Sequence, residues 1–248
     1  MLMFKNYVRV QSLEEAYTLN QSRRNKIIGG MLWLKMSNLN LGTAIDLCGL
    51  GLDTIEETED TFSIGCMVSL RQLEQHAGLN TYTGGMLAKA VQDIVGVQFR
   101  NTATVGGSIF GRFGFSDVLT ALLVADCQVE LYKGGLVPLE EFAAMPRDND
   151  ILVRLHLRKT PAKFSYEAMR TQRTDFPVLT VAASTLGKLA VGARPMKAMV
   201  LPIHGSAEEM ANYAVQHVPT AGNLRGSKDY RTHLVKVLTE RALLALGG

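Results

Sequence analysis

The sequence has only three cysteines, Cys48, Cys66 and Cys127, and they lie far apart. Zinc and iron-sulfur sites that are built from cysteine need closely spaced pairs, which this chain does not have. Cys66 stands between apolar residues. We therefore expect buried thiols in a reducing, cytoplasmic setting and no metal site in this chain.

Long apolar runs and a surplus of one charge are also missing. Lys5 and Arg9 interrupt the N-terminal ten residues, so we expect neither a signal peptide nor a membrane span. Lys and Arg number 26 against 23 Asp and Glu, a net charge of +3, and the basic residues are scattered among acidic ones. This distribution does not indicate nucleic-acid binding.

Side-chain motifs for catalysis are absent as well. The five histidines have neither metal-ligand spacing nor a nearby partner, and no serine nucleophile elbow or pair of acidic catalysts occurs. A Rossmann dinucleotide site would need a Gly-x-Gly-x-x-Gly pattern, which is also missing. If the chain belongs to an enzyme, a bound cofactor must perform the chemistry.

Two diglycine pairs, Gly29-Gly30 and Gly106-Gly107, each follow an apolar run of β-type residues. Glycine lacks Cβ and adopts positive φ freely, so successive main-chain amides can converge on a phosphate. For either pair alone, the alternative is a tight turn without a ligand, and we expect such a turn at Gly84-Gly85. The two pairs together predict two main-chain cradles that close on one anionic ligand.

A carboxylate, Asp117, follows the second diglycine pair at a short distance. It could accept hydrogen bonds from the hydroxyls of a ribityl or ribose chain. It could instead cap a helix over residues 118–124, or do both. The sequence leaves these alternatives open.

Hydrophobic periodicity predicts a chain in which helices and strands alternate and a tail in which strands precede helices. Soft boundaries near residues 53–60 and at Thr160-Pro161 divide it into three parts, 1–57, 58–160 and 161–248. The predicted helices are 13–20, 70–76, 86–95, 117–124, 207–217 and 228–246, and the predicted strands are 26–28, 44–47, 61–66, 127–132, 136–137, 151–157, 178–184 and 189–193. Ser12, Ser69 and Ser227 are the expected helix caps.

The run from Val95 to Ser108 closely resembles the flavin-binding signature of the FAD subunits of molybdenum hydroxylases, the family of xanthine dehydrogenase and carbon monoxide dehydrogenase. Further segments agree in the same order: Ile28-Gly29-Gly30, Ile64-Gly65-Cys66, Ser116-Asp117 and residues 226–234. The resemblance spans nearly the whole chain. It implies an α+β protein with a two-subdomain FAD-binding fold of the vanillyl-alcohol-oxidase/PCMH type, residues 1–57 and 58–160, and a C-terminal α+β flavoprotein domain, residues 161–248.

The same resemblance implies the residues that hold FAD. Asp117 should bond the sugar-like part, Ile94 should lie beside the cofactor, and Leu152 should touch the flavin ring. Arg170 is the nearest basic candidate for a lysine that some members place near the flavin. The residues implied around the pyrophosphate are Lys26, Ile27, Ile28, Gly29, Gly30, Met31, Leu32 and Trp33, together with Thr104, Val105, Gly106, Gly107 and Ser108.

The resemblance also implies an oxidoreductase subunit. A molybdopterin-binding large subunit would hydroxylate xanthine, another purine or heterocycle, or an aldehyde. A small 2Fe-2S subunit would relay electrons to FAD here, and FAD would pass them to NAD or another acceptor.

This chain departs from the family after the first diglycine, because Met31-Leu32 replace a polar pair and remove side-chain hydrogen bonds to phosphate. Two alternatives therefore remain open. One is a non-catalytic assembly subunit with a degenerate flavin site. The other is a stand-alone flavin oxidoreductase, against which the lack of a histidine or cysteine near the loops for covalent flavin attachment counts.

Overall fold

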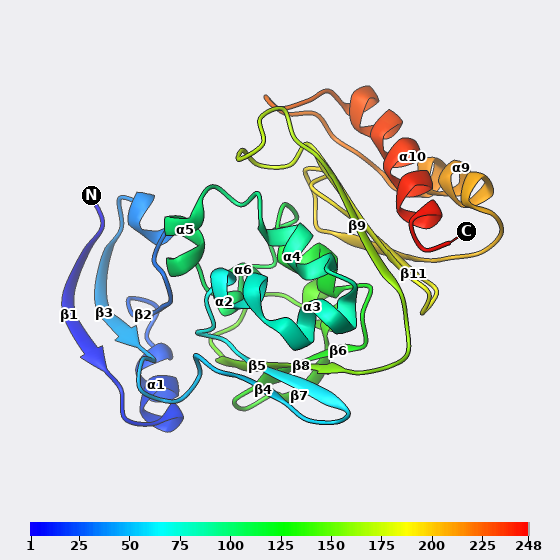
Figure 1. Ribbon diagram of the computed structural model, residues 1–248. Helices are drawn as coiled ribbons and strands as arrows, with labels where there is room; N and C mark the ends of the chain where they lie inside the picture. The colour runs from blue at the N-terminus through cyan, green and yellow to red at the C-terminus, as the bar shows by residue number, and fades with distance from the viewer. Residues whose placement is uncertain (248) are drawn as a thin grey trace.

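The computed structural model describes residues 1–247, which contain three β-sheets (Figure 1). The first is a parallel sheet with strand order β1-β3-β2, formed by β1 (Met3–Arg9), β3 (Asn40–Asp46) and β2 (Lys26–Ile28). Helix α1 (Leu13–Asn20) connects β1 to β2, and it begins at the predicted Ser12 cap. A short 3-10 helix, η1 (Leu34–Met36), lies between β2 and β3. Strand β1 was not predicted, because it is an edge strand whose side chains are mostly exposed.

The second sheet is antiparallel, with strand order β4-β5-β8-β6-β7. Its strands are β4 (Ile55–Glu57), β5 (Thr61–Gly65), β8 (Leu152–Arg158), β6 (Cys127–Leu131) and β7 (Gly135–Pro138). The side chains of Leu155 and Leu157 are buried while those of Arg154 and His156, which alternate with them, are partly exposed, as the alternating pattern predicted. The hairpin predicted at residues 133–135 joins β6 to β7.

Seven short helices accompany this sheet, and Figure 1 shows α2, α3, α4 and α6 on one side of it. They are α2 (Leu70–Gln75), α3 (Ala77–Thr83), α4 (Met86–Val91), α5 (Val97–Thr102), α6 (Val105–Phe110), α7 (Asp117–Leu122) and α8 (Leu139–Ala144). The helix predicted over 86–95 ends earlier, at Val91. Ser116, and not Asp117, caps α7, because the Ser116 hydroxyl accepts the Leu119 N–H at 3.2 Å.

The third sheet is antiparallel, with strand order β12-β11-β10-β9. Its strands are β9 (Phe164–Met169), β10 (Leu179–Ser184), β11 (Lys188–Gly192) and β12 (Met199–Pro202), and helices α9 (Ala207–His217) and α10 (Lys228–Leu244) follow them. Apolar residues of β10 and β11 pack with those of α9 and α10 in one core cluster, which includes Val181, Leu189 and Leu238. The sequence predicted β10, β11 and both helices, but neither β9 nor β12.

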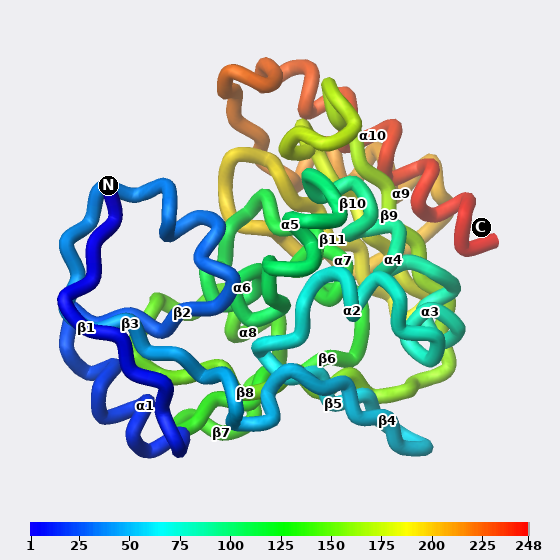
Figure 2. Tube along the Cα trace, turned by 60° about the vertical axis from the view of Figure 1, so that its left-hand side comes forward, coloured from blue at the N-terminus to red at the C-terminus, as the bar shows by residue number. Residues whose placement is uncertain are grey.

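The prediction of a mixed helix-and-sheet class is confirmed. The division at residues 57 and 160 remains a proposal. β4 lies before the first of these boundaries and pairs with β5 beyond it. Figure 2 shows the N-terminal strands at one end of the molecule and the C-terminal helices at the other. None of the helices in residues 1–247 is long and apolar enough to cross a membrane.

Two of the three cysteines agree with the expectation of buried thiols, and one does not. Cys66 and Cys127 are buried, and desolvation raises the pKa of each thiol to about 12. Cys48 is exposed, which corrects the prediction. It follows the last residues of β3, where the chain has left the sheet and reached the surface.

Candidate functional site

A pocket of about 340 Å³ opens where the three sheets approach one another. Its lining comes from the loop after β2, from the segment that runs from the end of α4 to α7, and from the loop after β9. The lining residues are 27–34, Leu70, Ile94, Val95, Phe99, Ala103, Thr104, Gly107, Ser108, Phe113, 115–118, Arg170 and 174–177.

The two diglycine segments lie against each other, as the sequence predicted. A Cβ atom placed on Gly30 would lie 1.9 Å from the carbonyl oxygen of Thr102, and one on Gly29 would lie 2.6 Å from the Oγ1 of Thr104. Glycine is needed here for close approach, because any side chain would hold the two segments apart. We also expected these glycines because they adopt positive φ, and this reason is wrong: none of the four glycines has a positive φ. Met31 has one instead, with φ of 57°.

The second diglycine lies in the first turn of α6 and not in a loop that follows a strand. Thr104 caps this helix by accepting the Gly107 N–H at 3.1 Å. The N–H groups of Val105 and Gly106 donate at 2.8 Å to the carbonyl oxygens of Val68 and Cys66. The main-chain N–H groups of this segment are therefore paired with acceptors inside the protein. This corrects the expectation of two equivalent main-chain cradles.

The first diglycine loop behaves differently. Among residues 1–247, the main-chain N–H groups of residues 29–33 have no hydrogen-bond acceptor. All five of these residues line the pocket. Residues 29–32 are only partly exposed. Because buried main-chain N–H groups are nearly always paired, a ligand that covers these five consecutive donors would have to supply acceptors, and anionic oxygens are suited to that.

A buried carboxylate, that of Asp117, forms another part of the lining. Its Oδ1 accepts the Tyr166 hydroxyl at 2.5 Å and the Arg170 Nη2 at 2.6 Å. Burial raises the pKa of the Asp117 carboxyl to about 6, while Arg170 and Tyr166 oppose that rise. Arg170 also donates to the carbonyl oxygen of Asp175, which ties the loop after β9 to the same place.

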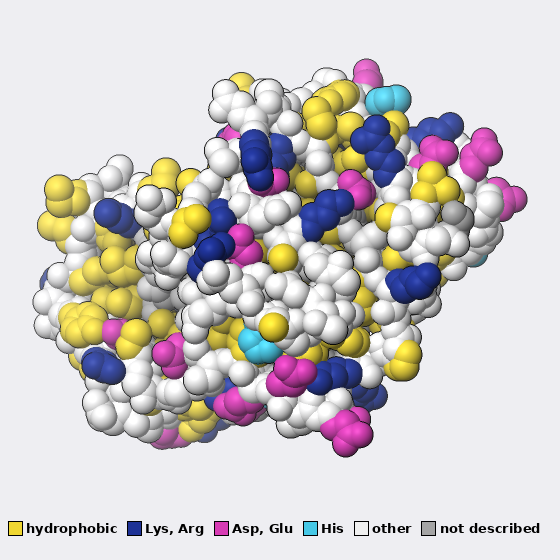
Figure 3. Space-filling view, in the orientation of Figure 1, with side chains coloured by type: hydrophobic (Ala, Val, Ile, Leu, Met, Phe, Trp, Pro, Cys, Tyr) yellow, Lys and Arg dark blue, Asp and Glu magenta, His cyan; other side chains and the backbone are white. Residues whose placement is uncertain are grey.

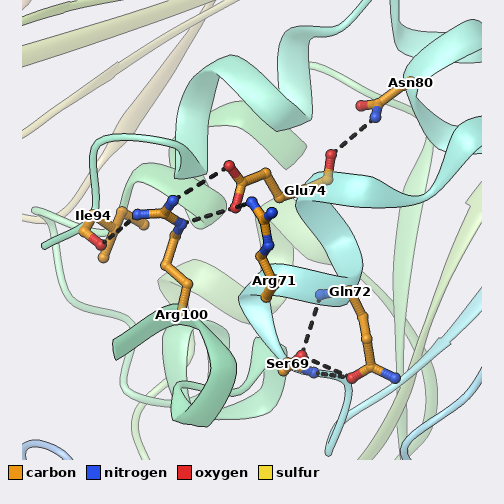
Figure 4. A network of polar contacts seen from close by, with 7 residues as sticks. All are labelled: Ser69, Arg71, Gln72, Glu74, Asn80, Ile94 and Arg100. Atoms are coloured by element: carbon orange, nitrogen blue, oxygen red, sulfur yellow. Dashed lines mark hydrogen bonds and ion pairs between the residues drawn. The ribbon is translucent and has the colours of Figure 1, made fainter. Parts of the chain in front are cut away.

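The pocket lining also includes Ile94 and Val95, and a partly buried ion pair lies close to Ile94 (Figure 4). Arg100 Nε donates to Glu74 Oε2 at 2.8 Å, and its Nη1 donates to the Ile94 carbonyl oxygen at 3.3 Å. Val95 has φ of 51°, a conformation that is costly for a β-branched residue. The Arg100 contacts thus fix a strained turn at the pocket wall.

One end of the pocket is aromatic, which the sequence did not predict. The Trp33 ring centroid lies 5.2 Å from that of Phe176 and 5.9 Å from that of Phe115. Arg225 stacks on Phe176 at 4.7 Å and pairs with Asp175 at 2.9 Å. These rings belong to three loops that are far apart in the sequence, so no local pattern could have grouped them.

Most of the residues named from the sequence line this one pocket: residues 27–33, Ile94, Thr104, Gly107, Ser108, Asp117 and Arg170. Four do not. Lys26 is exposed in β2, Val105 and Gly106 are buried in α6, and Leu152 is buried in the core of the second sheet. That the thirteen lining residues contact FAD remains a prediction.

A family model described as the FAD-binding domain in molybdopterin dehydrogenase matches residues 2–157. The chain belongs to this family. It is 25% identical to a xanthine dehydrogenase FAD-binding subunit of Escherichia coli O157:H7, across 100% of this chain and 99% of that protein. It is 30% identical to aldehyde oxidase 2 of Cavia porcellus over 146 residues, which are 51% of this chain and 11% of that protein.

Solved structures agree with this membership. Carbon monoxide dehydrogenase from Hydrogenophaga pseudoflava superposes with a TM-score of 0.87 at 20% identity, covering 98% of this chain and 96% of that one. Quinoline 2-oxidoreductase from Pseudomonas putida 86 gives 0.85 at 17% identity, covering 98% and 96%. At such identities these matches show the fold. The family, the PCMH-type fold, the oxidoreductase class and the FAD cofactor implied by the signature are confirmed.

The contact between Gly30 and Thr102 predicts that Gly30→Ala is severely disruptive. The new methyl group would meet the carbonyl oxygen at 1.9 Å. We expect a loss of about 1–3 kcal/mol of unfolding free energy, measured by urea denaturation, and weak FAD binding. Gly96→Ala is the matched control, because its nearest contact is 3.5 Å away. Equal losses in both variants would contradict the close-approach argument.

The left-handed conformation of Met31 predicts that Met31→Asn stabilises the protein. Asparagine tolerates this conformation better than methionine does, so we expect a gain of about 0.5–1 kcal/mol and a higher Tm by calorimetry. Leu32 has no positive φ, so Leu32→Asn should give no gain. A Tm that falls equally in the two variants would show that strain at Met31 is negligible.

Proposed function

We propose that the pocket binds FAD, and that the FAD accepts electrons from a 2Fe-2S partner subunit and passes them to NAD or another acceptor. A molybdopterin-binding large subunit of the same cytoplasmic complex would oxidise the organic substrate. The observation that carries this proposal is the row of five unpaired main-chain N–H groups at residues 29–33, which line a pocket that is also lined by a buried carboxylate.

The residues present fit this cofactor. The amides of residues 29–33 would hold the pyrophosphate, whose oxygens need donors and carry negative charge. Asp117 would accept hydrogen bonds from hydroxyls of the cofactor, because its Oδ2 accepts no hydrogen bond from any other residue among residues 1–247. When it is bound, FAD supplies the electron-transfer chemistry. The chain itself binds and orients the cofactor. It also excludes water from the site, because the apolar side chains of Met31, Leu32 and Ile94 line it.

Partner subunits are suggested by the exposed apolar surface of the N-terminal sheet. Met3 is 56% exposed and Tyr7 is 61% exposed on the edge strand β1. Figure 3 shows hydrophobic side chains, with a few charged ones among them, at the end of the molecule where the N-terminal strands lie. Parallel sheets are usually covered on both faces, so this surface is suited to contact with another chain. The xanthine dehydrogenase name of one relative supports purines such as xanthine as leading substrates of the complex. A purified complex that oxidises only non-purine substrates would reject that choice.

Two alternatives differ in what they predict. A degenerate flavin site is motivated by Met31-Leu32, but the unpaired amides at these positions weigh against it. Protein that stays colourless after reconstitution with FAD would favour this assembly role. A stand-alone flavin oxidoreductase would turn over substrate without any partner chain.

The single tryptophan gives a direct test of FAD binding. Trp33 lines the pocket, and it is the only tryptophan of the chain. We expect its fluorescence to be quenched during titration with FAD, because a flavin held in the pocket would lie close to the indole. FMN, which lacks the pyrophosphate, should bind at least about tenfold more weakly, since it would lose charge-assisted hydrogen bonds. Unchanged fluorescence up to millimolar FAD would contradict the proposal.

Partner binding is tested by purification of the tagged full-length chain from the cells that produce it. We expect two further chains in stoichiometric amounts, together with molybdenum and iron in metal analysis. Tyr7→Lys should release the partners without loss of FAD, because it replaces an exposed aromatic side chain by a charged one. Recovery of the chain alone under low salt would count against the complex.

A further inference from the structure

The carboxyl group of Asp117 is held from one side by two donors. Tyr166, which is 2% exposed, donates to Oδ1 at 2.5 Å, and Arg170 donates to the same atom at 2.6 Å. Asp117 lines the pocket, and Tyr166 lies behind it in β9 and does not line the pocket. Within residues 1–247, Oδ2 is left without a donor from any other residue.

We propose that Tyr166 is a positioning residue for FAD binding: its hydroxyl, with Arg170, fixes Oδ1 of Asp117, so that Oδ2 remains free to accept a hydroxyl of the sugar-like chain of the ligand. This inference rests on the proposed function, because it takes the ligand to be FAD. Tyr166 acts only through Asp117 and touches no ligand atom.

The surroundings of Tyr166 suit it to this role. Tyr166 pairs with Ala182 in the third sheet, and its ring is part of the main hydrophobic core, so its hydroxyl has a fixed position. Arg170, by contrast, also holds the Asp175 carbonyl oxygen of the loop after β9, so it serves two partners. A phenylalanine at 166 would keep the ring and its packing and remove the hydroxyl, which donates to Asp117 and also contacts the side chain of Thr180.

The arrangement also makes binding depend on pH. Tyr166 and Arg170 are the titratable groups in contact with the Asp117 carboxyl, and both lower its pKa against the larger effect of burial, which raises the pKa to about 6. A ligand hydroxyl donates to the ionised carboxyl, so FAD affinity should fall as the pH drops through about 6. Loss of the Tyr166 hydroxyl removes a hydrogen bond to the ionised form. It should therefore move that fall to higher pH.

The experiment compares Tyr166→Phe with Tyr82→Phe in the full chain. Tyr82 donates its hydroxyl to the carbonyl oxygens of Arg158 and Thr160, both at 3.0 Å, and it does not line the pocket. FAD dissociation constants are measured from pH 5 to 8 by Trp33 fluorescence. For Tyr166→Phe we expect binding about tenfold weaker at pH 7.5 and a pH midpoint about one unit higher. Tyr82→Phe should keep both wild-type values even if its Tm falls.

A second measurement does not need FAD. The carbon-13 chemical shift of the Asp117 carboxyl, assigned with Asp117→Asn, should titrate at higher pH in Tyr166→Phe than in the wild type. Wild-type affinity and carboxyl titration in Tyr166→Phe would overturn the positioning role while the proposed function stands. Failure of the wild type to bind FAD at any pH would overturn the proposed function, and the inference with it.

Discussion

The pocket depends on one main-chain contact, that of Gly30 against the carbonyl oxygen of Thr102. No side chain separates these atoms, so the loop after β2 can rest directly on the turn between α5 and α6. The N-terminal sheet is thereby brought against the second sheet with its loop turned toward Asp117 and the aromatic rings. A close-packed interior transmits such a contact, because the elements on either side cannot move independently.

The two glycine segments have different tasks. The second, in α6, pairs its amides with Val68, Cys66 and Thr104, and so it serves as a rigid support. The first leaves its amides unpaired at the pocket wall. Met31 and Val95, two of the residues with positive φ, lie in the pocket lining. Such conformations persist only where surrounding contacts enforce them, as Arg100 does for the turn at Val95.

The sequence predicted those parts of the molecule that local chemistry determines. Serine caps located the starts of α1, α2 and α10, alternation located β8, and the glycine pairs with Asp117 pointed to one pocket. Contacts between residues far apart in the sequence could not be predicted in this way. Phe176 contacts Trp33 across more than a hundred residues. The edge strand β1 has mostly exposed side chains, and the edge strand β12 has only four residues, so neither shows a clear alternation. The segment of the second diglycine, which we expected to be a loop after a strand, is instead the start of a helix. Thr104 caps this helix, because its side chain accepts the Gly107 N–H.

The apolar pair Met31-Leu32 is consistent with a working site because of where the donors come from. Polar side chains at these positions would add hydrogen bonds to a phosphate, but the five amides of residues 29–33 belong to the main chain and survive any substitution that keeps its path. Apolar side chains around them exclude water and lower the local dielectric constant, which strengthens each remaining interaction between an amide and an anion. A site that has lost polar side chains can therefore retain affinity as long as Gly29 and Gly30 keep the loop seated. At this loop the path of the main chain, and not the chemistry of the side chains at positions 31 and 32, decides whether an anion can bind.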